Sequence, residues 1–444
     1  MAFADPPPSL GSGFHRILNK IIDVKPGEVP ALAWSWLYIF SLLSSYYIMR
    51  PIRDQMGVAG GVNNLQWLFT GTLVGMLLLN LPFSYLVKTF PREQFITISY
   101  RFFSANILLF ALALYSATPE QTIWVGRIFF IWTSVFNLFV VSIFWQMIVD
   151  IFTSEQGKRL FGFIAAGATL GAISGSTFTV STVEHMVPGY LMVGAALMLE
   201  VAVFCVRRLS GLSTALSARP QIAAPQAPIG GTLLGGIRDA LSSSYLLNVS
   251  LFLLLYAVTS TFLYFQQAAV VSHSFESRAA QTAFFATVDL GVNLLTLAVQ
   301  LFLTGRILKW LGVGTTLSLL PLFSVLGFAA VAALTTLSSV VGFQLFRRAG
   351  NFAIARPTRE VLFTVLPRED RYKAKSFIDT VMYRLGDQIG AWSFALLSAL
   401  GLGLTQVSIV AVVISGFWLV NSLWLGRRQE ALAGEQEMLA EVQS

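Results

Sequence analysis

Apolar residues form long continuous runs along this chain of 444 residues, and short polar stretches separate the runs. A helix needs about 20 residues to cross a hydrocarbon core of roughly 30 Å. The runs do not alternate apolar and polar positions, so they exclude a transmembrane β-barrel. The pattern predicts twelve membrane-spanning helices, at residues 31–53, 65–87, 95–116, 121–150, 160–180, 188–206, 244–268, 281–304, 313–334, 337–364, 376–400 and 404–425.

The chain falls into two halves around a polar middle. Residues 207–243 are its longest polar connection and separate six predicted spans from six. An offset of about 215 residues places Leu170-Gly171 on Leu385-Gly386 and Gly175 on Gly390, which indicates an internal duplication. The predicted fold is therefore an all-α polytopic membrane protein of twelve transmembrane helices in two six-helix halves. That is the major facilitator pattern, in which the binding site lies between the halves.

Charge in the loops predicts the orientation. Lysine and arginine gather in the first 30 residues, in 207–243 and after residue 426, and they mark the cytoplasmic side. We therefore expect both termini in the cytoplasm. The expected parts are a cytoplasmic tail with an interfacial helix (1–30), an N-terminal half (31–206), a cytoplasmic linker (207–243), a C-terminal half (244–425) and a cytoplasmic tail (426–444).

Composition narrows the chemistry further. Hydrophobic residues make up 55% of the chain and charged residues 11%, which excludes a disordered chain and an ordinary soluble enzyme. One cysteine and three scattered histidines predict no metal site and no redox pair. The sequence has no GxxxxGK[ST] motif and no catalytic constellation. We expect no enzyme activity, no catalytic residue and no cofactor.

Ionisable residues inside the predicted spans are the candidate functional residues, because each costs roughly 2.5–3.5 kcal/mol at the bilayer centre. Cations outnumber anions there, which favours an anionic substrate, since guanidinium groups match carboxylate and phosphate oxygens. The candidate substrate-binding residues are Arg50, Arg53, Arg347, Arg348, Arg384, Asn351, Tyr46 and Tyr383. The candidates for charge compensation or coupling are Asp54, Asp289, Asp387 and Asp379.

Each candidate also has a structural explanation. Arg347 and Arg348 could serve only to pair with acidic groups, and Arg384 lies three residues before its possible partner Asp387. Asp379 is explained equally well by a contact with Lys375 or with a loop group. The tyrosines would be ordinary packing residues in a chain with 13% aromatics.

Two regions carry a resemblance to a known family. The run Tyr46-Tyr47-Ile48-Met49-Arg50-Pro51-Ile52-Arg53-Asp54 resembles the first-span motif of the ATP/ADP translocase-like carriers of the major facilitator superfamily. The runs Arg356–Val365 and Arg371–Asp387 resemble the tenth-to-eleventh-span region of shorter bacterial relatives. The resemblance implies an alternating-access nucleotide exchanger in the bacterial inner membrane. This chain departs from that family in having no lysine within its spans.

The sequence therefore predicts a secondary transporter of an organic anion, with a nucleotide or another phosphorylated metabolite as its substrate. The expected partners are this small anion and the lipid bilayer, with no nucleic acid, and the expected state is a monomer. Two alternatives stay open: a proton-coupled carrier of another solute, and a membrane scaffold or sensor that transports nothing.

Overall fold

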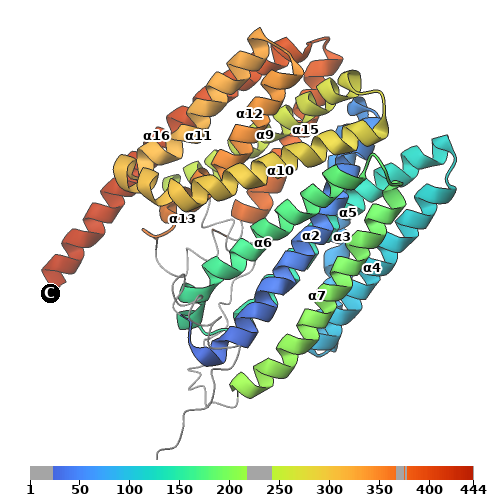
Figure 1. The fold of residues 1–444 in the computed structure, drawn as a ribbon. Helices are drawn as coiled ribbons and strands as arrows, with labels where there is room; N and C mark the ends of the chain where they lie inside the picture. Colours follow the sequence, from blue (N-terminus) through green and yellow to red (C-terminus); the bar gives the residue numbers. More distant parts are fainter. Residues whose placement is uncertain (1–23, 218–242, 367–374, 376–377, 444) are drawn as a thin grey trace, which may run out of the picture. The chain divides into compact units, whose positions relative to one another are not determined.

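The computed structural model describes residues 24–217, 243–366, 375 and 378–443. In these ranges the chain is helical almost throughout, and twelve helices have 14 residues or more. Ten of the helices are long and apolar enough to cross a membrane. The predicted all-α polytopic membrane fold is confirmed (Figure 1).

The chain forms two compact units. The first comprises Met1–Arg53 with Gly75–Ile222, and the second comprises Asp54–Val74 with Ala223–Ser444. The second unit thus includes a short segment from the N-terminal half. Asp54 in this segment accepts a hydrogen bond from the Tyr264 hydroxyl at 3.0 Å, and Thr70 donates one to Gln388 at 3.0 Å.

Six long helices supply the first unit, with the ends of two of them assigned to the second. They are α2 (Val29–Ala59), α3 (Leu65–Thr89), α4 (Arg92–Ser116), α5 (Pro119–Ile151), α6 (Ser154–Thr182) and α7 (Pro188–Ser217). Capping boxes begin α5 at Thr118 and α6 at Thr153, where each threonine hydroxyl accepts from the amide three residues on. Such caps satisfy amides that have no partner within the helix.

The second unit contains the helices of the C-terminal half. They are α9 (Ser244–Ser274), α10 (Arg278–Phe302), α11 (Thr304–Ala333), α12 (Leu337–Gly350), α13 (Arg356–Leu362), α15 (Tyr383–Ala399) and α16 (Leu404–Gln443). Helix α15 packs on α9, and α11 packs on α16. An apolar cluster that includes Phe252, Leu317 and Trp418 joins α9, α11 and α16.

Glycines allow close helix packing at corresponding places in both units. A Cβ at Gly171 of α6 would collide with the Phe40 carbonyl of α2, and one at Gly175 would lie 2.5 Å from the Ser44 carbonyl. In the second unit, a Cβ at Gly386 of α15 would lie 2.8 Å from the Leu254 carbonyl of α9. The predicted duplication therefore has a counterpart in packing: each unit fits one glycine-bearing helix against its first long helix.

The tenth and eleventh predicted spans each contain a π-helical turn, a feature that the sequence did not predict. A π-helical turn at Asn351–Ala355 separates α12 from α13, and another at Ile378–Met382 precedes α15. Neither α12 nor α15 is among the ten helices that meet the length and composition of a span. The π turns leave α12 with 14 residues and α15 with 17, which is shorter than a span, and turns of this kind occur frequently at functional sites.

Three other boundaries differ from the predicted ones or fall outside the structure. Helix α16 runs on from residue 425 to Gln443, because the tail is rich in alanine, glutamate, glutamine and leucine, which favour helix. Helix α7 likewise extends into the predicted linker as far as Ser217. The predicted interfacial helix within 1–30 lies outside the described residues, apart from a short 3-10 turn at Pro26–Glu28.

Candidate functional site

Arg347 of α12 lies in the interior of the second unit, with 1% of its surface exposed. Its Nη1 donates to the Ser260 hydroxyl of α9 at 2.7 Å, and its Nε donates to the Ser324 hydroxyl of α11 at 3.1 Å. Its Nη2 donates to Thr259 Oγ1 at 2.7 Å and to the Tyr256 carbonyl at 3.3 Å. One guanidinium group thus connects three helices through neutral oxygen atoms.

No carboxylate among the described residues forms an ion pair with Arg347. Two aromatic rings face the guanidinium instead, with centroids 5.1 Å away for Tyr256 and 5.8 Å away for Trp418. A ring face attracts a cation but carries no net charge. The charge of Arg347 is therefore solvated by dipoles and ring faces, and it stays electrostatically available to an anion.

Arg348 points to a different helix from its neighbour. Its Nη1 donates to Asp289 Oδ1 of α10 at 2.7 Å, in a pair whose side chains are 13% and 2% exposed. Its Nη2 is buried and has no hydrogen-bond partner in the described part of the chain. Arg348 therefore retains a donor for a further acceptor while Asp289 balances its charge.

Arg384 and Asp387 form the second interior pair, one turn apart on α15. Arg384 Nη1 lies 3.1 Å from Asp387 Oδ2, as their spacing predicted. Thr261 of α9 contacts the other carboxylate oxygen at 3.5 Å. Arg384 is 31% exposed by its side chain, and it also lies over the Tyr383 ring. The ring of Tyr383 in turn approaches that of Tyr256, which faces Arg347.

The remaining candidates of the second unit lie at its edges. Asp379, in the second π turn, binds Arg359 of α13 at 2.9 Å. Lys375 pairs with Glu360, so the predicted alternative of a Lys375–Asp379 contact is wrong. Asn351 caps α12 through its backbone amide, which donates to the carbonyls of Arg347 and Arg348. Of these residues only Asn351 directly adjoins the arginine pair.

The candidates of the first span divide between the units. Arg50 and Arg53 belong to the first unit, where Arg53 donates to Ser134 at 3.3 Å and lies over the Phe130 ring. Arg50 lies over the Tyr47 ring with its carbon 5.4 Å from the centroid, and Tyr47 packs edge-on against Tyr46. Asp54 belongs to the second unit.

Sequence reasoning missed the hydroxyls that hold Arg347. Ser260, Thr259 and Ser324 are common residues of membrane helices, and only folding places them around one guanidinium. Gln344, one turn before Arg348 on the same helical face, donates from its amide to Gln267 of α9 at 3.0 Å. The pair Thr259-Ser260 in an otherwise apolar run is the one signal that could have indicated a polar position on α9.

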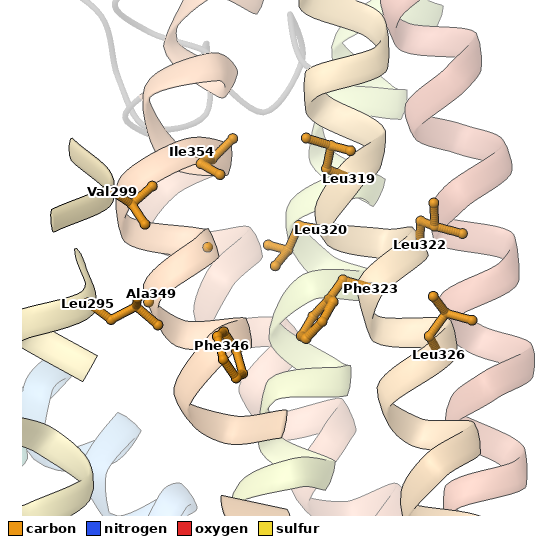
Figure 2. Close-up of a pocket in the computed structure, with 11 residues that line it drawn as sticks. Leu295, Val299, Leu319, Leu320, Leu322, Phe323, Leu326, Phe346, Ala349 and Ile354 are labelled. Atoms are coloured by element: carbon orange, nitrogen blue, oxygen red, sulfur yellow. The ribbon is translucent and has the colours of Figure 1, made fainter. Parts of the chain in front are cut away.

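An apolar pocket with a volume of about 380 Å³ lies between α10, α11 and α12 of the second unit (Figure 2). Its walls come from α10, α11, α12 and the first π turn, and they include Leu295, Phe323, Phe346 and Ile354. No lining side chain carries a charge, and Phe323 and Phe346 are partly exposed. Its lining suits a hydrocarbon and not an anion, so we place the candidate site on the arginine side of α12.

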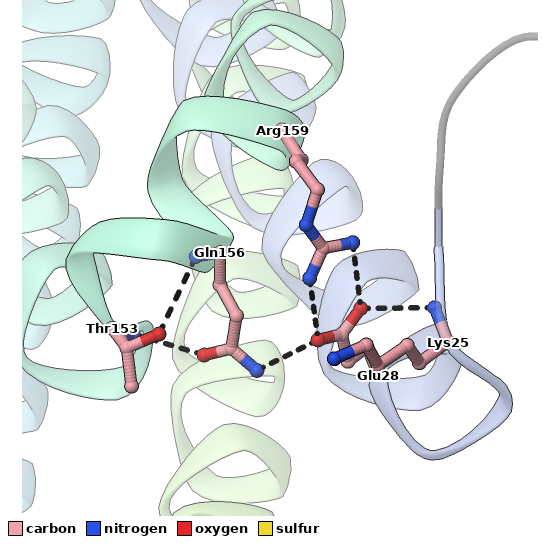
Figure 3. Close-up of polar contacts among 5 residues, drawn as sticks. All are labelled: Lys25, Glu28, Thr153, Gln156 and Arg159. Carbon is pink, nitrogen blue, oxygen red and sulfur yellow. Dashed lines mark hydrogen bonds and ion pairs between the residues drawn. The ribbon is translucent and has the colours of Figure 1, made fainter.

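A second polar cluster lies in the first unit, directly before the start of α2 (Figure 3). Glu28 accepts from Gln156 at 2.8 Å, from the Lys25 amide at 2.9 Å and from both terminal nitrogens of Arg159, the nearer at 3.0 Å. Burial by itself raises the pKa of Glu28, but these hydrogen bonds and the charge of Arg159 outweigh it and lower the pKa below its ordinary value. The cluster anchors the start of α2 to the start of α6.

Comparison with known proteins identifies the fold. No protein-family model matches the chain, and no curated protein matches it by sequence. Among solved structures, a bacterial homologue of the human lysosomal transporter Spinster, inward-facing and unoccupied, aligns with a TM-score of 0.59 at 13% identity. That alignment covers 92% of this chain and 99% of the homologue.

Two further structures give the same result. An auto-inhibited peptide transporter of the POT family aligns with a TM-score of 0.60 at 13% identity, over 89% of this chain and 96% of that one. The nucleoside transporter NupG aligns with a TM-score of 0.52 at 14% identity, over 90% and 98%. The chain thus shares the overall helical fold of these solved structures.

Proposed function

We propose that the protein is a secondary transporter that moves a small organic anion across the membrane by alternating access. Arg347 carries the proposal: it is a fully buried cation that only neutral groups surround. An isolated buried charge is costly, and a structural role alone would be met by an uncharged side chain. A carboxylate or phosphate is the natural partner of such a guanidinium.

The two ion pairs supply a means of coupling. Arg348 and Arg384 are neutralised by Asp289 and Asp387 when the site is empty. A bound anion would compete with Asp289 and Asp387 for the two arginines. The ion pairs would then break, and the helices that carry them could move, only when substrate is present. This exchange of partners would link occupancy to the movement of α10, α12 and α15.

A nucleotide is the substrate that we propose to test first, in exchange for a second nucleotide. The resemblance of the Tyr46–Asp54 and Arg356–Val365 segments to the ATP/ADP translocase-like carriers supports this choice. The aromatic rings of Tyr256 and Tyr383 near Arg347 would suit a planar base. A proton-coupled carrier remains the alternative, since Asp387 is a buried carboxylate with a single arginine partner.

The experiment is uptake by purified protein in liposomes, with labelled nucleotides, nucleosides, sugar phosphates and dicarboxylates. We expect uptake of a phosphorylated compound that requires internal substrate and persists with a proton ionophore. Arg347→Met keeps much of the side-chain volume and removes the charge. It should lower substrate affinity about tenfold to a hundredfold, the effect of one lost charge-assisted hydrogen bond of roughly 1.5–3 kcal/mol.

Arg428→Met is the matched control, because Arg428 is an exposed arginine outside the interior network. Normal uptake by well-folded Arg347→Met protein would refute the anion site. Uptake that collapses with the ionophore and ignores internal substrate would favour the proton-coupled alternative. If the parent protein takes up none of these compounds, the result would favour the alternative of a membrane scaffold or sensor that transports nothing.

We also propose that both termini are cytoplasmic and that the membrane is the bacterial inner membrane, as the loop charges and the resemblance predict. A reporter fused after Arg428 should then be active only on the cytoplasmic side. One inserted after Ser274, the last residue of α9, should be active only outside. Activity of both on one side would overturn the proposed topology.

A further inference from the structure

An ion pair lies within an exposed apolar surface of the first unit. Arg101 of α4 and Glu200 of α7 are 3.8 Å apart, and their side chains are 53% and 44% exposed. The two helices pack against each other along the unit (Figure 1). This exposure is the reverse of the usual arrangement, in which ionisable residues of membrane helices face the protein interior.

The residues around the pair mark this surface as lipid-facing. On α4, Arg101 shares a helical face with Leu108 and Leu112, which are exposed. On α7, Glu200 shares a face with three exposed apolar residues, Val193, Leu197 and Phe204. We name this surface, with its two charges, the α4–α7 face.

The pair also lies deep along its helices. Arg101 is nine residues beyond Arg92, the charged start of α4, which corresponds to roughly 13 Å at the α-helical rise. Glu200 is seven residues before Arg207, or roughly 10 Å. The Arg92–Asp150 pair lies at the ends of α4 and α5, whereas Arg101 and Glu200 lie well within their apolar helices.

The pair leaves hydrogen-bonding capacity unused. Neither side chain makes a hydrogen bond to any residue in the part of the chain that the structure describes, and the 3.8 Å ion pair is their one contact there. A guanidinium has five donors and a carboxylate about four acceptor sites. In hydrocarbon these groups gain strongly from further partners, because no water is present to supply them.

The outer helix pair of the second unit provides a comparison. Helix α11 has no charged residue after Lys309, and α16 has none before Arg427. Their exposed residues, such as Leu326 and Phe417, are apolar, as lipid contact requires. A charged pair is therefore not a requirement of this kind of helix packing, and its presence on the α4–α7 face calls for a separate explanation.

We propose that the α4–α7 face is a dimer interface, occupied by a second copy of this chain. A cation beside an anion is complementary to itself after a two-fold rotation, so Arg101 of each copy would meet Glu200 of the other. The four charges would then form a closed ring with no net charge. A phosphate headgroup would satisfy Arg101 but would meet the repulsion of Glu200 within the same few ångströms. The proposal is independent of the substrate and departs from the monomer that the sequence predicted.

Charge reversal with mixing is the decisive experiment. Arg101→Glu gives a copy with two acidic groups on the face, and Glu200→Arg gives a copy with two basic groups. Each should fail to pair with itself, whereas a mixture of the two should form heterodimers. Full-length protein carrying one of two dyes is reconstituted in phosphatidylcholine vesicles, and energy transfer between dyes reports association.

We expect the parent and the mixture to associate, and each reversed variant alone to associate about three- to twentyfold more weakly, the range for a polar contact between membrane helices. Arg92→Glu, in the exposed pair at the helix ends, is the matched control and should associate like the parent. Replacement of both groups by leucine removes the ring without introducing charge, and it should weaken association to the same degree even if a reversed variant fails to fold.

Two results would overturn the proposal. One is a monomeric parent at protein densities where a known membrane dimer associates. The other is unchanged association of the Arg101→Leu/Glu200→Leu protein. If the parent binds added phosphatidylglycerol or phosphatidylethanolamine through Arg101 without self-association, a lipid headgroup is the occupant and the dimer is rejected.

Discussion

The α2–α6 pair of the first unit and the α9–α15 pair of the second share a packing scheme but differ in their polar contacts. In the first pair, the Ser44 hydroxyl donates to the Gly171 carbonyl at 3.1 Å, a contact between two neutral groups at the packing glycine. In the second pair, Thr261 contacts Asp387, which also binds Arg384. A repeated backbone arrangement thus supports a neutral contact in one unit and a charged one in the other.

The same contrast extends to the neighbouring helices. The offset of 215 residues aligns Trp132 and Thr133 of α5 in sequence with Arg347 and Arg348 of α12. Trp132 stacks among Phe103, Phe110, Phe129 and Phe136, whereas Arg347 is held by hydroxyls. We infer that the fold was duplicated with its packing glycines, and that the buried arginine pair of α12 has no charged counterpart on α5.

The largest expected effect comes from breaking an interior pair of the second unit. Asp289→Ala leaves the buried Arg348 without its anion and should destabilise the protein by about 3–5 kcal/mol. Asp289→Leu with Arg348→Met removes both charges and should restore most of the folded yield. Thermal unfolding in detergent measures the stability of the single and the double variant. If the double variant is no more stable than Asp289→Ala, the loss does not come from an unpaired Arg348 charge.

The packing glycines should have equal importance in both units. Gly171→Ala and Gly386→Ala each force a Cβ against backbone atoms and should cost about 1–3 kcal/mol, the usual range for overpacking. The control is Gly416→Ala on α16, where a Cβ meets no atom within 4 Å. If only one of the two substitutions destabilised the protein, the close helix packing at Gly171 and at Gly386 would not be equally important in the two units.

The smallest effect concerns Glu28, which anchors the start of α2 to α6 in the first unit. Because its pKa is lowered on folding, its contribution to stability is present above the pKa of the unfolded state and disappears as pH falls through the folded value. Glu28→Gln should therefore cost about 1 kcal/mol at neutral pH, as for a hydrogen bond weakened by loss of charge.

Below the pKa of the folded carboxyl, parent and Glu28→Gln should unfold at similar temperatures, so their difference narrows as pH is lowered. Unfolding scans at neutral and at acidic pH test this. A difference that stays constant with pH would mean that the carboxylate charge does not stabilise this junction. Arg159→Met should reproduce the neutral-pH loss, since it removes the same interaction from the other side.

The interior charges show how far sequence reasoning reaches into the site. The spacing of Arg384 and Asp387 on one helix predicted their pairing, because residues three apart on a helix are neighbours. The pairing of Arg348 with Asp289 joins positions 59 residues apart, and no local rule connects them. The hydroxyls around Arg347 come from two other helices, so neither their identity nor their number could be read from the neighbourhood of residue 347.

The sequence by itself determined the membrane class and the two-half organisation, because hydropathy and glycine spacing are local properties. It also singled out the arginines of α12 and α15, although not Arg101 of α4. It did not predict the π turns that follow α12 and precede α15, because a π turn depends on packing around the helix and not on hydropathy. Only the tertiary structure decided which carboxylate neutralises which arginine, that Arg347 has neutral partners, and that Arg101 and Glu200 meet on an exposed face. These contacts join side chains far apart in the chain, and the packing angle and rotation of each helix select them.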